Sequence, residues 1–190
     1  LDASGYEIGV FSGQPEDFGG ISAAVGMREV ADRFVDAEVL KDQRAFSFAA
    51  QGSLLVDENI VLDRFDAALG DAAAWETPQF VYLNFQTPHF PYHHDAVPHR
   101  FANPPLERGQ IAEDNREALE RTYWNAVAHT DAALGRLIAK LETMGVWQDT
   151  VLIVTGDHGE ALPKRSQLVW VGCDGDCVYE GVHLADELVS

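Results

Sequence analysis

An aspartate and a histidine stand side by side where an apolar run ends, in Val-Leu-Ile-Val-Thr-Gly-Asp-His-Gly-Glu at residues 151–160. Gly156 and Gly159 allow the backbone to turn sharply on both sides of the pair, so Asp157 and His158 can point into one cavity. A carboxylate oxygen and an imidazole nitrogen together suit Zn²⁺, Mn²⁺ or a similar divalent ion. Asp157 and His158 are therefore candidate metal ligands. The alternative is that Asp157 caps the following segment and His158 is an ordinary loop residue.

A second candidate for chemistry is His89, in Thr-Pro-His-Phe-Pro-Tyr at residues 87–92. Proline precedes it and a Phe-Pro pair follows, and the fixed φ of proline restricts the backbone around the imidazole, as a preorganised site requires. The alternative is a histidine packed in an aromatic loop. The surrounding stretch, residues 87–110, holds four of the seven histidines and shows little periodicity. It predicts a long ordered loop.

The elements that must position these residues are short apolar strands. Four segments have the composition of strands in a parallel sheet: residues 7–11, 79–85, 150–155 and 167–171. His89 follows the second of them, and the Asp157–His158 pair follows the third. Open α/β sheets bind their ligands at the carboxyl ends of strands. The sequence therefore predicts an α/β fold, with a mainly parallel sheet flanked by helices.

Two helices are predicted from apolar spacing. A long helix at residues 113–144, capped by Asp114 or Asn115 at its start and by Gly145 at its end, connects the second and third strands in a parallel crossover. Its apolar stripe consists of Leu119, Tyr123, Val127, Leu134, Leu137, Leu141 and Met144. A shorter helix at residues 58–74 has Val61, Leu62, Phe65 and Leu69 on its inner face. Residues 12–56 show little pattern beyond one helix from Met27.

Composition and charge exclude several classes of partner. The formal net charge of -18 argues against a nucleic-acid surface and against binding to anionic membranes. No apolar run reaches the roughly 18–20 residues of a membrane-spanning helix, so we expect no membrane span in this chain. The two cysteines, Cys173 and Cys177, fit either a small disulfide loop in an oxidising compartment or two free thiols.

Three segments jointly resemble the sulfatase branch of the alkaline phosphatase superfamily, which includes arylsulfatases, lipoteichoic acid synthases and phosphoethanolamine transferases. They are Leu-Asn-Phe-Gln-Thr-Pro-His-Phe-Pro-Tyr at 83–92, Ala-His-Thr-Asp-Ala-Ala-Leu-Gly-Arg-Leu-Ile at 128–138, and Thr-Gly-Asp-His-Gly-Glu at 155–160. The opening Gly-Tyr-Glu-Ile-Gly-Val-Phe also resembles the strand that follows the nucleophile helix in that family. The likeness covers residues 5–159 and, more loosely, 167–188.

The resemblance implies a role for each matching residue. Asp157 and His158 match the family's metal-binding pair, and His89 matches a histidine that contacts the transferred sulfuryl or phosphoryl group or the leaving-group oxygen. Asp131 and Gly135 match a structural feature of the long helix, and His183 matches a scaffold segment. We assign no catalytic role to these last three.

The chain also departs from the family pattern. The family nucleophile and the other carboxylate ligands of the metal precede the point where this chain begins, and Cys-x-Pro-x-Arg occurs nowhere in it. After Glu160 the family continues through a loop with another His or Lys that reaches the anion, whereas residues 161–166 here run almost directly into the next predicted strand. Lys164 is the candidate for that contact. We expect residues 1–190 to be the C-terminal part of a single sulfatase-like, alkaline-phosphatase-like catalytic domain, incomplete by itself.

The function implied is metal-dependent hydrolysis or transfer of a sulfate or phosphate ester, with this chain supplying part of the site. The resemblance implies Ca, Mn, Zn or Mg as the ion and a small-molecule, glycan or lipid-headgroup ester as the substrate. Sulfatase and phosphotransferase are nearly balanced, with the Asp157–His158 pair leaning slightly toward the phosphotransferases. One alternative is a catalytically inactive, acidic binding module with the sulfatase fold. Another is a generic α/β domain with a proline-rich loop. The resemblance favours an extracytoplasmic location, periplasmic or at the cell surface, over a cytoplasmic one.

Overall fold

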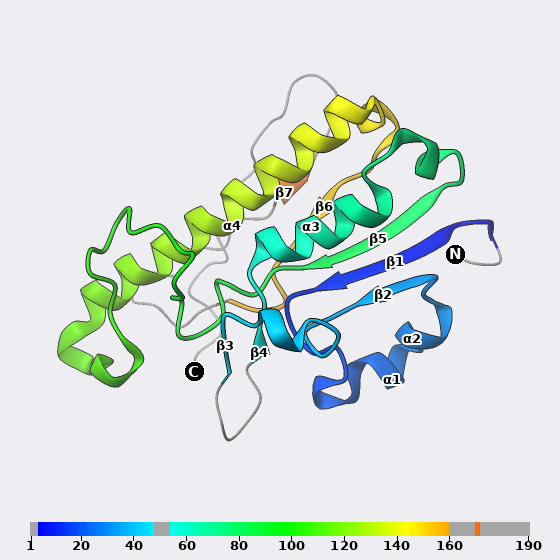
Figure 1. Ribbon diagram of the computed structural model, residues 1–190. Helices are drawn as coiled ribbons and strands as arrows, with labels where there is room; N and C mark the ends of the chain where they lie inside the picture. The colour runs from blue at the N-terminus through cyan, green and yellow to red at the C-terminus, as the bar shows by residue number, and fades with distance from the viewer. Residues whose placement is uncertain (1–3, 48–53, 160–169, 172–190) are drawn as a thin grey trace, which may run out of the picture.

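A computed structural model describes residues 4–47, 54–159 and 170–171 (Figure 1). Its centre is a three-stranded parallel sheet in the order β2–β1–β5, formed by Arg33–Val35, Glu7–Ser12 and Gln79–Asn84. Gly9 and Phe11 of β1 pair with Arg33 and Val35 of β2, and β1 pairs with β5 over its whole length. The predicted strands at 7–11 and 79–85 are confirmed. The short strand β2 was not predicted.

Two helices cover one face of this sheet (Figure 1). α3 (Glu58–Leu69) and α4 (Arg116–Met144) lie side by side, and α3 packs on β1. The core between them is apolar and consists mainly of Phe11, Val61, Leu62, Phe65, Leu69, Leu137 and Leu141. The predicted inner face of α3 is therefore confirmed, although the helix ends at Leu69 and a separate 3-10 turn follows it.

The buried face of α4 differs from the predicted stripe in its first half. Leu137 and Leu141 are buried as expected, but Leu119, Tyr123 and Val127 are only partly buried. The fully buried positions there are Thr122, Asn125, Ala126, His129 and Ala133. The reason is that this half of the helix faces the loop after β5 and pairs with its backbone N–H groups. Asn125 Oδ1 accepts from Phe101 N at 2.7 Å, and Thr122 Oγ1 accepts from Leu106 N at 2.8 Å.

The helix ends agree in part with the expected caps. Gly145 has φ 75° and its N–H bonds back to the last turn of α4, which is the left-handed cap that the sequence predicts. At the other end Asn115 occupies the cap position without a capping side-chain bond. Its amide instead donates to the carbonyl of Gln110 at 2.6 Å.

The prediction of a buried parallel strand at 150–155 is wrong for the part of the chain described. β6 comprises only Ile153–Val154 and pairs antiparallel with β7, Trp170–Val171. Val151 is 86% exposed and Ile153 is 78% exposed. The apolar run has the composition of a strand covered on both faces, but here these two side chains are uncovered, so composition alone did not fix the pairing.

The remaining elements are short. β3 (Phe46–Ser47) and β4 (Leu54–Leu55) form an antiparallel pair, and the helix expected from Met27 is the single turn α2 (Met27–Val30), preceded by α1 (Ile21–Val25). The 3-10 helices are Phe18–Gly20, Lys41–Gln43, Ala72–Trp75, Arg108–Gln110, Glu113–Asn115 and Trp147–Asp149. The predicted long loop is confirmed, because β5 and the turn at Arg108 are joined by irregular chain. None of the helices described is both long and apolar enough to cross a membrane.

Candidate functional site

The carboxyl ends of the three parallel strands meet at one edge of the sheet, and each is followed by polar side chains. Asn84, the last residue of β5, donates from Nδ2 to Oε1 of the buried Glu16 at 2.9 Å. Asp36, which directly follows β2, accepts at Oδ2 from the backbone N–H of Glu16 at 3.3 Å. The loop after β1 is thus held between its two neighbouring strands.

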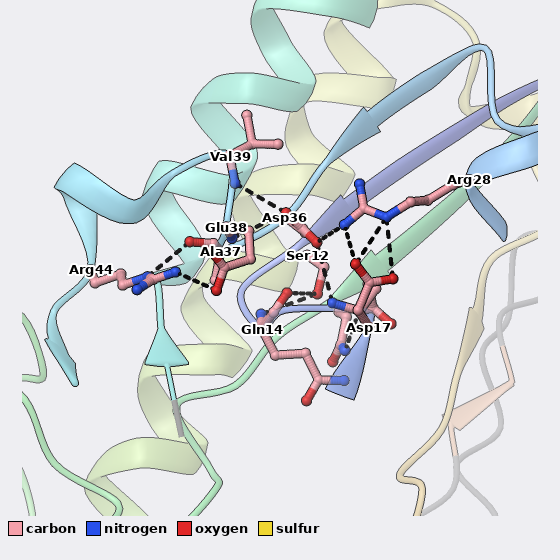
Figure 2. Close-up of polar contacts among 11 residues, drawn as sticks. Ser12, Gln14, Asp17, Arg28, Asp36, Ala37, Glu38, Val39 and Arg44 are labelled. Carbon is pink, nitrogen blue, oxygen red and sulfur yellow. Dashed lines mark hydrogen bonds and ion pairs between the residues drawn. The ribbon is translucent and has the colours of Figure 1, made fainter. Parts of the chain in front are cut away.

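Asp36 organises this edge through four hydrogen bonds (Figure 2). Its Oδ1 accepts from the backbone N–H groups of Glu38 and Val39, both at 3.1 Å. Its Oδ2 accepts from Arg28 Nη2 at 3.0 Å, and the same guanidinium pairs with Asp17 at 2.9 Å. A buried carboxylate requires this many donors, because burial removes the water that would otherwise solvate it.

The predicted metal pair lies exposed after β6. The backbone N–H of His158 donates to Asp157 Oδ1 at 3.0 Å, and His158 Nε2 lies 3.8 Å from the same oxygen. Ligand atoms bound to one divalent ion at about 2.1 Å lie roughly 3–4 Å apart. The side chains of Asp157 and His158 therefore have a separation that fits two ligands of one ion.

Asp157 acts electrostatically on the central sheet. Burial raises the pKa of Tyr82, on β5, to about 12, and the negative charges of Glu16 and Asp157 add to the rise. The phenol consequently stays protonated near neutral pH. Because the charges of Glu16 and Asp157 both act on Tyr82, both carboxylates lie near this part of β5.

His89 lies near the start of the loop after β5, as predicted, and is exposed. Its Nδ1 lies 2.9 Å from the carbonyl oxygen of Phe90, a contact that orients the ring. In the described ranges His89 does not join Asp157 and His158 in a set of three or more converging metal-ligand atoms. Lys164, Cys173, Cys177 and His183 lie outside the described residues, as does most of the predicted strand at 167–171.

A buried cluster that the sequence did not predict stands between α3, α4 and the loop after β5. Its members are Asp57, which caps α3, Glu58, His94 from the loop, and His129 from α4. His129 Nε2 lies 2.6 Å from Asp57 Oδ2 and 3.5 Å from Glu58 Oε2, and His94 Nε2 lies 3.7 Å from Asp57 Oδ2. Two features of the sequence could have indicated this cluster: the adjacent Asp57 and Glu58 at the start of a predicted helix, and His129 within the long helix.

Burial and charge separate the two histidines of the cluster. The hydrogen bond to Asp57 raises the pKa of His129 above its ordinary value, despite burial. Burial raises the pKa of Asp57, but the bonds from His129 and from the backbone of Asn59 outweigh it, so the net shift is downward. Burial lowers the pKa of His94 to about 4, although the charge of Asp57 opposes the shift. His129 and Asp57 thus form an ion pair beside a neutral His94.

Solved structures identify the fold. The lipoteichoic acid synthase LtaP from Listeria monocytogenes matches with a TM-score of 0.55 and 19% identity, covering 80% of this chain and 34% of that one. A protein of the alkaline phosphatase superfamily from Vibrio parahaemolyticus matches with a TM-score of 0.50 and 20% identity, covering 85% of this chain and 37% of that one. At these identities the likeness concerns the fold alone, which is that of the alkaline phosphatase superfamily.

Sequence comparison identifies the family to which the chain belongs within that fold. The Sulfatase family model matches residues 1–176, and the chain belongs to the Sulfatase family. An ulvan-active sulfatase from Formosa agariphila is 28% identical over 110 residues, which is 50% of this chain and 21% of that protein. The chain therefore spans about a fifth of the length of this relative. The family expected from residues 83–92, 128–138 and 155–160 is confirmed.

Proposed function

We propose that the protein containing this chain hydrolyses or transfers a sulfate or phosphate ester, and that residues 1–190 are the C-terminal part of its catalytic domain. The observation that carries the proposal is the Sulfatase family match over residues 1–176. The position of the two candidate segments supports it, since both follow strands and both are exposed to solvent. The substrate is a small-molecule, glycan or lipid-headgroup ester.

Asp157 and His158 would hold a divalent ion (Ca, Mn, Zn or Mg), completed by ligands that this chain does not supply. When bound, such an ion neutralises charge on the non-bridging oxygens of the ester. The 3.8 Å between His158 Nε2 and Asp157 Oδ1 supports this assignment. The charge of Asp157 helps to raise the pKa of Tyr82 to about 12, so the phenol stays protonated and can donate a hydrogen bond.

His89 would contact the transferred group or the leaving-group oxygen. Its ring is oriented by the contact between Nδ1 and the carbonyl oxygen of Phe90, as a preorganised site requires. Donation of a proton to a leaving oxygen by a positioned imidazole contributes about 10²–10⁴-fold to a rate. Lys164 would add an anion contact, and an extracytoplasmic location fits the family expectation.

The test uses the protein at the full length that its gene encodes, assayed with p-nitrophenyl sulfate and p-nitrophenyl phosphate. We expect Asp157→Asn to remove one bound ion and nearly all turnover, and His89→Ala to lower kcat by about 10²-fold or more with the ion retained. Asp131→Asn, an exposed carboxylate on α4, is the matched control and should change neither quantity. Unchanged turnover in both Asp157→Asn and His89→Ala would overturn the proposal and leave the acidic binding module in its place.

A further inference from the structure

The buried cluster of Asp57, Glu58, His94 and His129 has the arrangement of a metal site. Its four ligand atoms come from three separate segments of the chain and all lie within 4.8 Å of one another. All four residues are buried. Two carboxylates and two imidazoles converging on one point form a donor set that suits Zn²⁺ and similar divalent ions.

In each carboxylate one oxygen accepts hydrogen bonds from the supporting chain, and the other faces the histidines. Asp57 Oδ1 accepts from the backbone N–H of Asn59 at 2.9 Å, while Oδ2 faces both histidines. Glu58 Oε1 accepts from Thr87 N at 2.8 Å and from Thr130 Oγ1 at 3.1 Å, while Oε2 faces His129 and accepts from the Thr87 hydroxyl. Supporting hydrogen bonds of this kind orient ligands around bound metals in proteins.

The imidazoles are directed to the same point. The rings of His94 and His129 stand edge to face, with centroids 5.7 Å apart, and both turn Nε2 toward Asp57 Oδ2. The Thr87 hydroxyl lies between Glu58 Oε2 and His94 Nε2. Ligand atoms on a four-coordinate zinc lie about 3.4 Å apart, close to the separations of 3.5 and 3.7 Å. The 2.6 Å contact between His129 Nε2 and Asp57 Oδ2 is a hydrogen bond, which would lengthen when an ion replaces its proton.

Charge gives a separate reason for a cation. Asp57 and Glu58 are adjacent, and Glu58 is 0% exposed. Among the residues that the structure describes, their ion-pair contacts are with His94 and His129 and with no lysine or arginine. Two buried carboxylates need a compensating positive charge, which a divalent ion supplies.

We propose that Asp57, Glu58, His94 and His129 bind one divalent transition-metal ion, with Zn²⁺ the ion that suits this donor set best. The site shares no ligand with the Asp157–His158 pair. It joins the start of α3 to the middle of α4 and to the loop after β5, which Figure 1 shows crossing the N-terminal half of α4. The ion would thereby fix the loop that carries His89.

The experiment counts ions in the full-length protein after equilibration with Zn²⁺ and removal of loosely bound metal. The double variant D157N/H158A disables the exposed pair, and we expect it to retain one ion per chain. Adding His94→Ala to that background should remove the ion, whereas adding His99→Ala, an exposed histidine of the same loop, should not. EDTA should lower the Tm of D157N/H158A by several degrees and leave the variant that lacks His94 unchanged.

Retention of the same ion without His94, or absence of any ion from D157N/H158A, would overturn the proposal and leave a hydrogen-bonded ion pair. If His94→Ala does not fold, crystals of D157N/H158A measured at the zinc absorption edge decide the question. An anomalous peak between Asp57 and His129 supports the site, and no peak there refutes it.

Discussion

Asp36 offers a sharp test of how the sheet edge is held together. It is 0% exposed and accepts four hydrogen bonds, two at each carboxylate oxygen. In Asp36→Asn the amide oxygen can keep the bonds from Glu38 and Val39. The amide nitrogen would then replace Oδ2, where it faces two other donors, Arg28 and the N–H of Glu16.

The expected cost follows from these two lost bonds. A buried N–H left without an acceptor costs about 1–3 kcal/mol. The lost pair with the partly exposed Arg28 adds about 1 kcal/mol, reduced by solvent screening. We therefore expect Asp36→Asn to lower the free energy of unfolding by about 2–4 kcal/mol. Asp36→Ala should cost about 2 kcal/mol more, because the N–H groups of Glu38 and Val39 also lose their acceptor.

The measurement is urea unfolding of the full-length protein, followed by tryptophan fluorescence. Asp17→Asn is the matched control. Asp17 is the exposed partner of the same Arg28 guanidinium, so its replacement should have a much smaller effect on the free energy of unfolding. An Asp36→Asn protein whose stability lies within about 0.5 kcal/mol of the parent would refute the assignment of these bonds.

Three further predictions concern the core, the end of α4 and the buried histidine. Phe65→Ala should destabilise by about 3–5 kcal/mol in urea unfolding, because Phe65 is 1% exposed between Phe11 and Trp75; a loss below 1 kcal/mol would contradict this packing. Gly145→Ala should cost about 1 kcal/mol, because φ there is 75°; an unchanged Tm counts against the left-handed cap. In chelator-treated protein, the pKa of about 4 at His94 means that the unfolded chain takes up a proton at a higher pH than the folded one. The free energy of unfolding should therefore be highest above pH 6.5 and fall by about 3 kcal/mol between pH 6.5 and 4. A Tm that stays constant over that pH range would refute the lowered pKa of His94. In His94→Gln the dependence of Tm on pH should disappear.

The sequence predicted those elements whose burial pattern is local. Val61, Leu62, Phe65 and Leu69 repeat at helical spacing, and that spacing alone assigns the inner face of α3. Strands β1 and β5 were predictable because each is a short, continuous apolar run. β2 did not stand out, because three residues next to a polar segment carry too little pattern, and their pairing comes from β1.

The sequence also placed His89 and the Asp157–His158 pair after strands, and their common family is confirmed by comparison. Their roles stay predictions. The family motif is readable because its residues are contiguous, as in Thr-Gly-Asp-His-Gly-Glu. The exposure of Val151 and Ile153 was not readable, since it depends on what packs beside the strand and not on the strand itself.

The sequence by itself determined four features of this protein. They are the contiguous motifs, the helical periodicity of α3, the left-handed cap at Gly145 and the strong negative charge. Only the tertiary structure decided the buried face of α4, where polar residues replace the expected apolar stripe, and the cluster that includes Asp57 and His129. These two residues are 72 positions apart. Local propensity and spacing act over a few residues, whereas convergence of side chains from α3, α4 and a loop depends on how the whole chain packs.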